Sequence, residues 1–484
     1  MSADWCVVRL ADIASKITKG TTPSKKDGGF SEAGINYIKA ESVGYDGRID
    51  SSKFSFITED VHNKLKRSQL EVNDILFSMA GVHLGKVGVV EQKHVPANTN
   101  QALALIRLKG DLVKPLYVLY FLQQREVVHF VNNATSQSAQ PNINLQDIGN
   151  LEIRLPSFEV QKNIVNILSS LDNKIELNNQ TNQTLEQMAQ AIFKSWFVDF
   201  EPVKAKITAL EAGGSEDDAL LAAMQAIAGS ALFATDAADA DAQTQLARLQ
   251  TEHPEQYATL RATAELFPSA MQESELGETP EGWSAATLAD FGDVVCGKTP
   301  SKQKAEYYGS EVPFIKIPDM HGNVFVTKAN EYLSSEGAAS QPKKSIPKGS
   351  VCVSCIATVG LVVIAIEDSH TNQQINSIVP KKHVYTPYLY FRMQSLNKHL
   401  HDLASGGSAT LNLNTSTFSK IQIIKPAEAV LEKYHEVTAQ LLNKILEGSL
   451  ESQTLSELRD TLLPKLLSGE IDVSALADNT EVNA

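Results

Sequence analysis

The chain has 484 residues, of which 43% are hydrophobic and 21% charged. This composition excludes a disordered or fibrous protein and allows two to four domains. A net charge of −14 counts against a phosphate-bearing partner, because Lys and Arg bind phosphates. The acidic residues are unevenly distributed, however. Residues 1–158 carry 18 basic and 16 acidic side chains, and residues 281–426 carry 14 basic and 11 acidic ones. Residues 201–280 carry only 4 basic but 14 acidic side chains. Two blocks are therefore weakly positive, at +2 and +3, and one segment is strongly acidic.

Cysteine content and apolar runs bear on the compartment. Four cysteines in so long a chain cannot form a disulfide framework, and free thiols are typical of a reducing compartment. The first ten residues lack the pattern of a signal peptide. The longest apolar run, Val359 to Ile366, is less than half a membrane span. We expect a cytoplasmic protein without a membrane-spanning segment.

The chain repeats itself. Trp5 and Leu10–Ile13 return as Trp283 and Leu288–Phe291 at an offset of 278. The offset drifts to 277 and 272 and then stays at 270 from Tyr120 and Tyr390 onward. A drifting offset indicates loops of varying length, and a fixed one indicates long helices. Short β-rich runs such as Asp74–Met79 and Val351–Ile356, separated by Gly, Pro and Ser clusters, predict a mixed α/β domain in each copy.

Each domain precedes a predicted long helix, residues 157–202 and 427–471. Apolar residues on alternating steps of three and four predict a coiled-coil seam. Asn178 and Asn182 interrupt the first seam at mid-length, as Gly448 and Ser452 interrupt the second. Antiparallel pairing would place these two gaps opposite one another. We expect Pro202 to close the first helix and Pro464 to kink or end the second. The predicted interface residues are Ile164, Leu168, Leu171, Ile175, Leu185, Ile192, Leu441, Ile445, Leu455 and Leu462.

The fold class predicted is therefore α/β (α+β), with two repeated mixed α/β domains separated by two long helices packed as an antiparallel coiled coil. The domains are residues 1–156 and 281–426. Residues 203–280 have no counterpart in the second half, are rich in alanine and carry the acid, so we expect an inserted helical arm or spacer. Residues 472–484 are expected to be a flexible tail.

One segment fits a catalytic pattern. Gly292 to Thr299 matches the phosphate-loop spacing G-x-x-x-x-G-K-[ST]. A phosphate loop needs a buried strand before it and a helix opening at Lys-Thr, but Pro300 follows directly here, and the first copy lacks both the leading Gly and the Lys. Cys352 and Cys355 have half of a zinc or redox spacing, but core thiols in an apolar strand are the better interpretation. We predict no catalytic residue and no metal site.

Three polar loops recur at matching places in both copies. Loop 1 is residues 22–26 and 299–302, loop 2 is residues 98–101 and 371–374, and loop 3 is residues 136–142 and 405–412. Asn and Gln can bond adenine edges, while Ser, Thr and Lys hold phosphates. For any single residue, a turn or strand-capping role is about as well supported. The candidate DNA-binding residues are Thr22, Ser24, Lys25, Lys26, Asn98, Asn100, Gln101, Ser136, Gln137, Ser138, Gln140, Lys298, Thr299, Ser301, Lys302, Asn372, Gln373, Gln374, Ser405, Ser408 and Thr410.

Several segments are distinctive when taken together: Gly-Lys-Thr-Pro-Ser at 297–301 with Tyr-Tyr-Gly at 307–309, and residues 155–200, 274–283 and 458–471. Through these segments the chain resembles, over nearly its full length, the DNA-specificity subunit of type I restriction–modification systems. The long insert and the less regular end of the second helix depart from the family pattern.

This resemblance implies two target-recognition domains, each reading one half of a split double-stranded DNA site. It implies that adenine-N6 methylation and ATP-dependent cleavage belong to separate modification and restriction subunits. S-adenosylmethionine, ATP and Mg would then be cofactors of those partners, with none in this chain. Three rival hypotheses remain: a recognition component of a system without restriction, a nucleotide hydrolase that uses Lys298, and a coiled-coil scaffold that never touches DNA.

Overall fold

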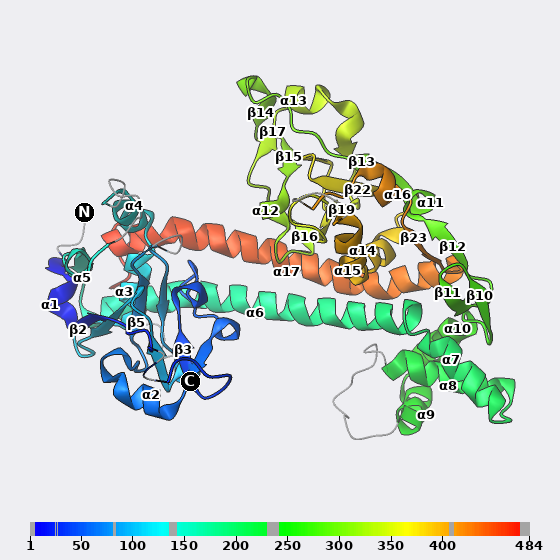
Figure 1. Cartoon of the computed structure of the whole chain (residues 1–484), viewed down its shortest axis with the longest axis horizontal. Helices are drawn as coiled ribbons and strands as arrows, with labels where there is room; N and C mark the ends of the chain where they lie inside the picture. The colour runs from blue at the N-terminus through cyan, green and yellow to red at the C-terminus, as the bar shows by residue number, and fades with distance from the viewer. Residues whose placement is uncertain are drawn as a thin grey trace. The chain divides into compact units, whose positions relative to one another are not determined.

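The computed structural model describes residues 5–24, 26, 28–80, 84–134, 143–229, 242–405 and 411–474. It divides into two compact units. The first unit comprises residues 1–175 and 454–484, and the second comprises residues 176–453. Each unit contains one copy of the repeat together with parts of both long helices (Figure 1).

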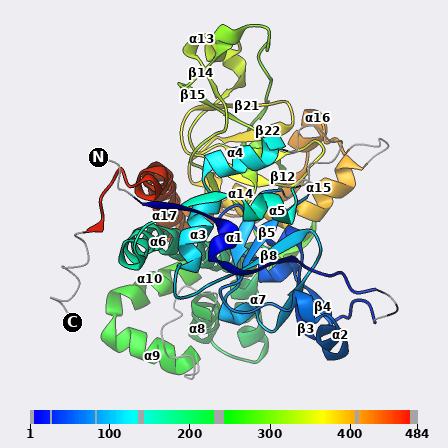
Figure 2. The same cartoon turned by 90° about the vertical axis from the view of Figure 1, so that its left-hand side faces the viewer.

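The domain in the first unit is built on a four-stranded sheet of order β2-β8-β5-β6, in which all neighbours are antiparallel. A three-stranded sheet of order β4-β3-β7 joins it, and β1 pairs with β9. Figure 2 shows α2 beside β3 and β4. The elements are β1 (Cys6–Arg9), α1 (Leu10–Ile13), β2 (Ala14–Lys19), β3 (Ile35–Ile38), β4 (Ser55–Ile57), α2 (Glu59–Lys64), β5 (Ile75–Ser78), β6 (Val87–Val89), β7 (Ala97–Thr99), β8 (Leu103–Leu108), α3 (Pro115–Leu122), α4 (Arg125–Ala134), α5 (Leu145–Gly149) and β9 (Glu152–Leu155).

The larger sheet is the middle layer of this domain because both of its faces are apolar. Along β5, Ile75 and Phe77 join a core cluster with the buried residues of α3, while Leu76 joins a second cluster with Ile38 of β3. Alternate side chains of a strand point to opposite faces. The continuous apolar run of β5 therefore reflects a strand covered on both sides.

The second unit repeats this architecture with sheets of order β13-β22-β19-β20-β16 and β14-β17-β15-β21-β18. Its elements are β12 (Ser284–Thr287), α11 (Leu288–Phe291), β13 (Gly292–Cys296), β14 (Tyr308–Gly309), β15 (Val312–Ile315), α12 (Ile317–Met320), β16 (Phe325–Val326), β17 (Tyr332–Leu333), α13 (Ser335–Ala339), β18 (Ser345–Ile346), β19 (Val351–Ser354), β20 (Val362–Ala365), β21 (Ser369–Thr371), β22 (Ile375–Pro380), α14 (Tyr385–Ser395), α15 (Asn397–Ala404), α16 (Thr415–Ser419) and β23 (Gln422–Lys425).

Strand registers confirm the internal repeat. Cys6 pairs with Leu155 in the first copy, and Ser284 pairs with Lys425 in the second. The parallel pairing of β3 with β7 recurs as β15 with β21. These pairs obey the offsets of 278, 270, 277 and 272 found in the sequence, so the drift of the offset lies in the loops between strands.

The two long helices are α6 (Phe158–Phe197) and α17 (Glu428–Ser468). In the first unit the start of α6 packs against the end of α17, since Ile164 and Leu168 share a cluster with Leu466. In the second unit the end of α6 packs against the start of α17, where Ile192 shares a cluster with Tyr434. The predicted antiparallel pairing is confirmed in both units.

Most residues predicted to lie between the two helices belong to these two core clusters or pack against them. They are Ile164, Leu168, Leu185, Ile192, Leu441, Ile445 and Leu462. The remaining three, Leu171, Ile175 and Leu455, are half-buried.

The polar gaps of the two seams meet, as antiparallel pairing requires. Asn178 donates its amide to the carboxylate of Glu451 at 2.8 Å, and Asn182 donates to the hydroxyl of Ser449 at 3.1 Å. A Cβ at Gly448 would stand 2.6 Å from the Asn182 amide oxygen. A small residue opposite an asparagine thus lets the two helices approach while the amide stays hydrogen-bonded.

Pro202 does not close the first helix, and Pro464 does not end the second at its own position. Helix α6 ends at Phe197, and Pro202 lies in the first turn of α7 (Glu201–Glu211), where a missing N–H is no cost. Between them Phe200 adopts a left-handed conformation with φ of 56°. Pro464 lies inside α17, which continues to Ser468.

The acidic insert is helical, as predicted, but it is packed rather than a free arm. It contains α7, α8 (Glu216–Ile227), α9 (Ala242–Glu252) and α10 (Pro254–Glu265), followed by a hairpin of β10 (Met271–Ser274) and β11 (Gly277–Pro280). Phe267 meets Trp196 of α6 edge-on at 5.1 Å, and Met224 joins the core of the second unit. Val473, within the expected tail, is buried in the core of the first unit, and residues 475–484 lie outside the described residues. Within the described chain, no helix is long and apolar enough to cross a membrane.

Candidate nucleic-acid interface

Loops 1 and 2 are joined by the same backbone contacts in both domains. In the first, Thr21 N–H donates to the carbonyl of Thr99 at 2.9 Å. In the second, Lys298 N–H donates to the carbonyl of Thr371 at 2.9 Å. The residues just before these donors are Gly20 and Gly297, where a Cβ would stand 2.2 Å from a carbonyl oxygen of loop 2. Only glycine fits this approach, which explains why both copies have it.

The residue that directly follows loop 3 is bonded to the end of the central strand, next to loop 2; of loop 3 itself, only Ser405, Leu411 and Asn412 lie within the described residues. Ile143 directly follows loop 3 and donates to the carbonyl of Met79, whose own N–H donates to Ala102 at 2.9 Å. In the second domain Leu413 donates to Cys355, whose N–H donates to Gln374 at 2.7 Å. Loops 1 and 2 and the residue that follows loop 3 therefore lie at one end of the sheet in both domains, where β2 and β5 (or β13 and β19) finish and β8 (or β22) begins.

Most described candidate residues present polar atoms at this end. Asn100, Thr299 and Gln374 are half-buried, and Thr299 donates its hydroxyl to the Gln373 side chain at 2.7 Å. Lys25, Ser136, Gln137, Ser138, Gln140, Ser408 and Thr410 lie outside the described residues. The exposed candidates are Thr22, Ser24, Lys26, Gln101, Lys298, Ser301, Lys302, Gln373 and Ser405.

Two candidates need correction because their side chains are buried. Asn98 has no exposed surface, and its amide donates to Ser68 Oγ at 2.9 Å and to the Leu65 carbonyl at 3.1 Å. Asn372 is 7% exposed and bonds the side chain and backbone N–H of Gln374. Both amides shape loop 2 from within, so they cannot reach a base edge in this conformation.

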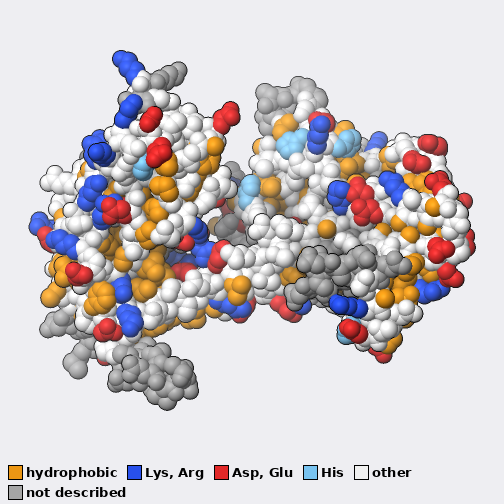
Figure 3. Space-filling model, turned by 90° about the horizontal axis from the view of Figure 1, so that it is seen from below, with side chains coloured by type: hydrophobic (Ala, Val, Ile, Leu, Met, Phe, Trp, Pro, Cys, Tyr) orange, Lys and Arg blue, Asp and Glu red, His pale blue; other side chains and the backbone are white. Residues whose placement is uncertain are grey.

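Sequence reasoning missed a basic segment beside loop 1. The turn between α2 and β5 carries Lys64, Lys66 and Arg67 on the surface. Arg67 donates from its guanidinium to Thr21 Oγ1 at 3.2 Å, and Lys16 of β2 donates to the Arg67 carbonyl at 3.1 Å. The sequence signal that could have identified this segment is the presence of three basic residues within four positions. Figure 3, with this domain at the left, shows Lys and Arg side chains spread over the visible face.

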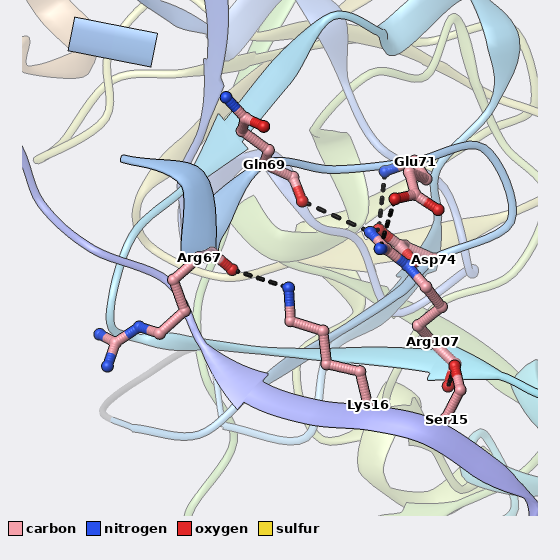
Figure 4. Close-up of polar contacts among 7 residues, drawn as sticks. All are labelled: Ser15, Lys16, Arg67, Gln69, Glu71, Asp74 and Arg107. Atoms are coloured by element: carbon pink, nitrogen blue, oxygen red, sulfur yellow. Dashed lines mark hydrogen bonds and ion pairs between the residues drawn. The ribbon is translucent and has the colours of Figure 1, made fainter. Parts of the chain in front are cut away.

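An ion pair holds this segment in place (Figure 4). Arg107 of β8 makes a bidentate bond to Asp74, at 2.7 and 2.8 Å, and also contacts Glu71. The Asp74 side chain is 1% exposed, and its hydrogen bond to Arg107 raises the pKa of that guanidinium. A buried carboxylate without its partner would be costly. The pair therefore fixes the chain just after Arg67, whose guanidinium points away from the cluster in Figure 4.

The phosphate-loop pattern has a structural explanation. Gly292 to Cys296 form strand β13, and no helix opens at Lys298 in this fully described stretch. A Cβ at Gly292 would stand 2.4 Å from the Val379 carbonyl oxygen, so sheet packing accounts for that glycine as it does for Gly297. A nucleotide site using Lys298 is not supported.

The Cys-x-x-Cys pair consists of core thiols. Burial raises the pKa of Cys352 to about 12 and that of Cys355 to about 11. The two belong to different core clusters. All four cysteines of the chain are free thiols, and the described residues hold no group of three or more His, Cys, Asp or Glu that could bind a metal ion.

Comparison with known proteins agrees with this geometry. A family model described as the type I restriction modification DNA specificity domain matches residues 2–187 and 280–452. The type I restriction enzyme HindI specificity subunit of Haemophilus influenzae is 44% identical over 422 residues, covering 85% of this chain and 89% of that protein. The MjaIX specificity subunit of Methanocaldococcus jannaschii is 21% identical, covering 98% of this chain and 95% of that protein.

A solved structure of a type I restriction–modification S subunit from M. genitalium shares the fold, with a TM-score of 0.51 at 14% identity and 96% of both chains covered. The chain belongs to the type I restriction–modification DNA-specificity family. It is the non-catalytic, DNA-recognising component of such a system, and it acts in a complex with other subunits and DNA.

Proposed function

We propose that loops 1, 2 and 3 of each domain form a DNA-contacting surface, and that each domain reads one half of a bipartite site. The observation that carries the proposal is that loops 1 and 2 and the residue following loop 3 meet at one end of the sheet in both domains, with matched backbone bonds of Thr21 and Lys298. Exposed Thr, Ser, Lys and Gln at these places suit phosphate and base-edge contacts.

From the family to which the chain belongs, we further propose its roles toward the partner subunits. The chain directs adenine-N6 methylation by modification subunits and ATP-dependent cleavage by a restriction subunit, and S-adenosylmethionine, ATP and Mg are cofactors of those partners. Its free thiols support a cytoplasmic location. The net charges of only +2 and +3 on the two domains suggest that partner subunits supply part of the phosphate contact.

The test uses the full chain assembled with its modification subunit. Replacing Thr22, Ser24 and Gln101 by alanine should abolish methylation at the mapped target and weaken binding of its duplex at least tenfold. A matched variant with Gln92 and Lys93 replaced should behave as wild type, because these exposed residues precede β7, whereas the replaced Gln101 of loop 2 follows it. Unchanged affinity and methylation in the loop variant would refute the proposal.

A further inference from the structure

A second basic position recurs beside loop 1 in both domains, outside the polar loops themselves. Helices α2 and α13 begin with matched caps, Thr58 and Ser334, at an offset of 276. Each is followed by a short 3₁₀ turn, Lys66–Ser68 in the first domain and Pro342–Lys344 in the second. The same offset places Arg67 opposite Lys343.

Both turns are tied to the same position of the chain entering loop 1. In the first domain the tie is the hydrogen bond from Arg67 to the Thr21 hydroxyl. In the second, Gln341 donates its side-chain amide to the carbonyl of Lys298 at 2.8 Å. Thr21 and Lys298 are themselves matched at the offset of 277. The turn that carries a cation is thus bonded to the same chain position in each domain, through the Arg67 side chain itself in the first and through Gln341, two residues before Lys343, in the second.

These two cations lack the usual acidic neighbours. Arg67 and Lys343 are exposed, and no carboxylate of the described residues forms an ion pair with either. By contrast, Lys53 and Lys93 are exposed cations paired to Asp50 and Glu91, each at 3.0 Å. An exposed cation that bonds only neutral groups keeps its full charge available for a phosphate.

We propose that Arg67 and Lys343 each bind a backbone phosphate of the DNA beside the base-reading loops, one in each half-site. The inference rests on the proposed function and adds two contacts from a different segment of each domain. Arg67 uses one guanidinium nitrogen on Thr21 and has further N–H groups for a phosphate. Phosphate contacts fix register and carry no sequence information, so the two side chains add affinity without changing which bases are read.

The experiment measures the dissociation constant of the assembled complex for its target duplex across a range of salt concentrations. Each phosphate contact contributes about 0.9 to the slope of log K against log salt for duplex DNA. Arg67→Ala and Lys343→Ala should each lower the slope by about one unit, and the double variant by about two. Arg67→Lys should restore the slope, and Lys93→Ala should leave it unchanged. The methylated sequence should stay the same in every variant.

The outcomes separate the inference from the proposed function. If both alanine variants keep the wild-type slope while the loop variant loses binding, the phosphate assignment is wrong and the recognition surface stands. If Arg67→Ala changes the methylated sequence, Arg67 reads a base, and the assignment is again wrong. If the wild-type complex binds no duplex, the proposed function itself fails. Loss of the slope in Arg67→Lys as well would show a structural role for Arg67.

Discussion

The close approach of loops 1 and 2 can be tested by adding one methyl group to each domain. In Gly20→Ala the new Cβ would stand 2.2 Å from the carbonyl oxygens of both Thr99 and Asn100. The optimal separation of such atoms is about 3.5 Å, and the obstructing atoms are backbone rather than flexible side chains. The strand end or loop 2 must therefore move by about 1 Å, at an overpacking cost of about 3 kcal/mol. Gly297→Ala meets the same obstacle at 2.2 and 2.3 Å in the second domain.

The assay is urea unfolding followed by hydrogen exchange of peptides from each unit. With a slope of about 2–3 kcal/mol per molar urea, a loss of about 3 kcal/mol lowers the midpoint by about 1 M. Gly20→Ala should lower it in the first unit alone, and Gly297→Ala in the second alone. Gly110→Ala is the matched control, because no atom lies within 4 Å of its Cβ, and it should shift stability by less than about 0.5 kcal/mol. A Gly20→Ala protein as stable as this control would show that the loops do not approach as described.

Three further outcomes are expected. Burial lowers the pKa of His94 and His370 below the ordinary 6.5, so the unfolded chain takes up protons first as pH falls below 6.5. The free energy of unfolding measured with urea should therefore drop between pH 6.5 and 5, by up to about 1.4 kcal/mol per pH unit for each histidine, and His370→Asn should flatten this dependence. Arg107→Met leaves buried Asp74 unpaired and should cost about 3–5 kcal/mol in urea unfolding, partly recovered by adding Asp74→Asn. Inserting four residues after Thr181, about one helical turn, should change the gap between half-sites but not their sequences; an unchanged gap in mapped methylation would contradict a ruler role for the helices.

The sequence predicted what depends on spacing along the chain. The repeat offsets located both mixed α/β domains, both helices and the matched positions of loops 1 and 2, because strands and helices tolerate few insertions. The polar gaps at Asn178 and Gly448 also followed from periodicity alone, since antiparallel pairing leaves them no other partner.

The errors arose where a residue's role depends on distant neighbours. Asn98 looks like a loop amide in sequence, but Ser68 and Leu65, some 30 residues earlier, bury it. Arg67 was missed for the same reason, because its contact with Thr21 spans 46 residues. Pro464 was expected to break a helix that continues for only four more residues, where few hydrogen bonds remain to be lost.

The two domains share the backbone arrangement of the proposed recognition surface, but different side-chain contacts stabilise it in each. The glycine, the backbone bonds between loops and the turn that carries a cation recur, and under the proposed function these features fix where a DNA strand lies. The supporting pair Arg107 and Asp74 does not recur, because the matched positions are Val379 and Ser350. The second domain holds its turn through Gln341 instead. The loop positions are the same in both domains, although the contacts that stabilise them differ. Each domain can therefore change its loop residues, and hence the bases that it is proposed to recognise, without moving the proposed phosphate contacts.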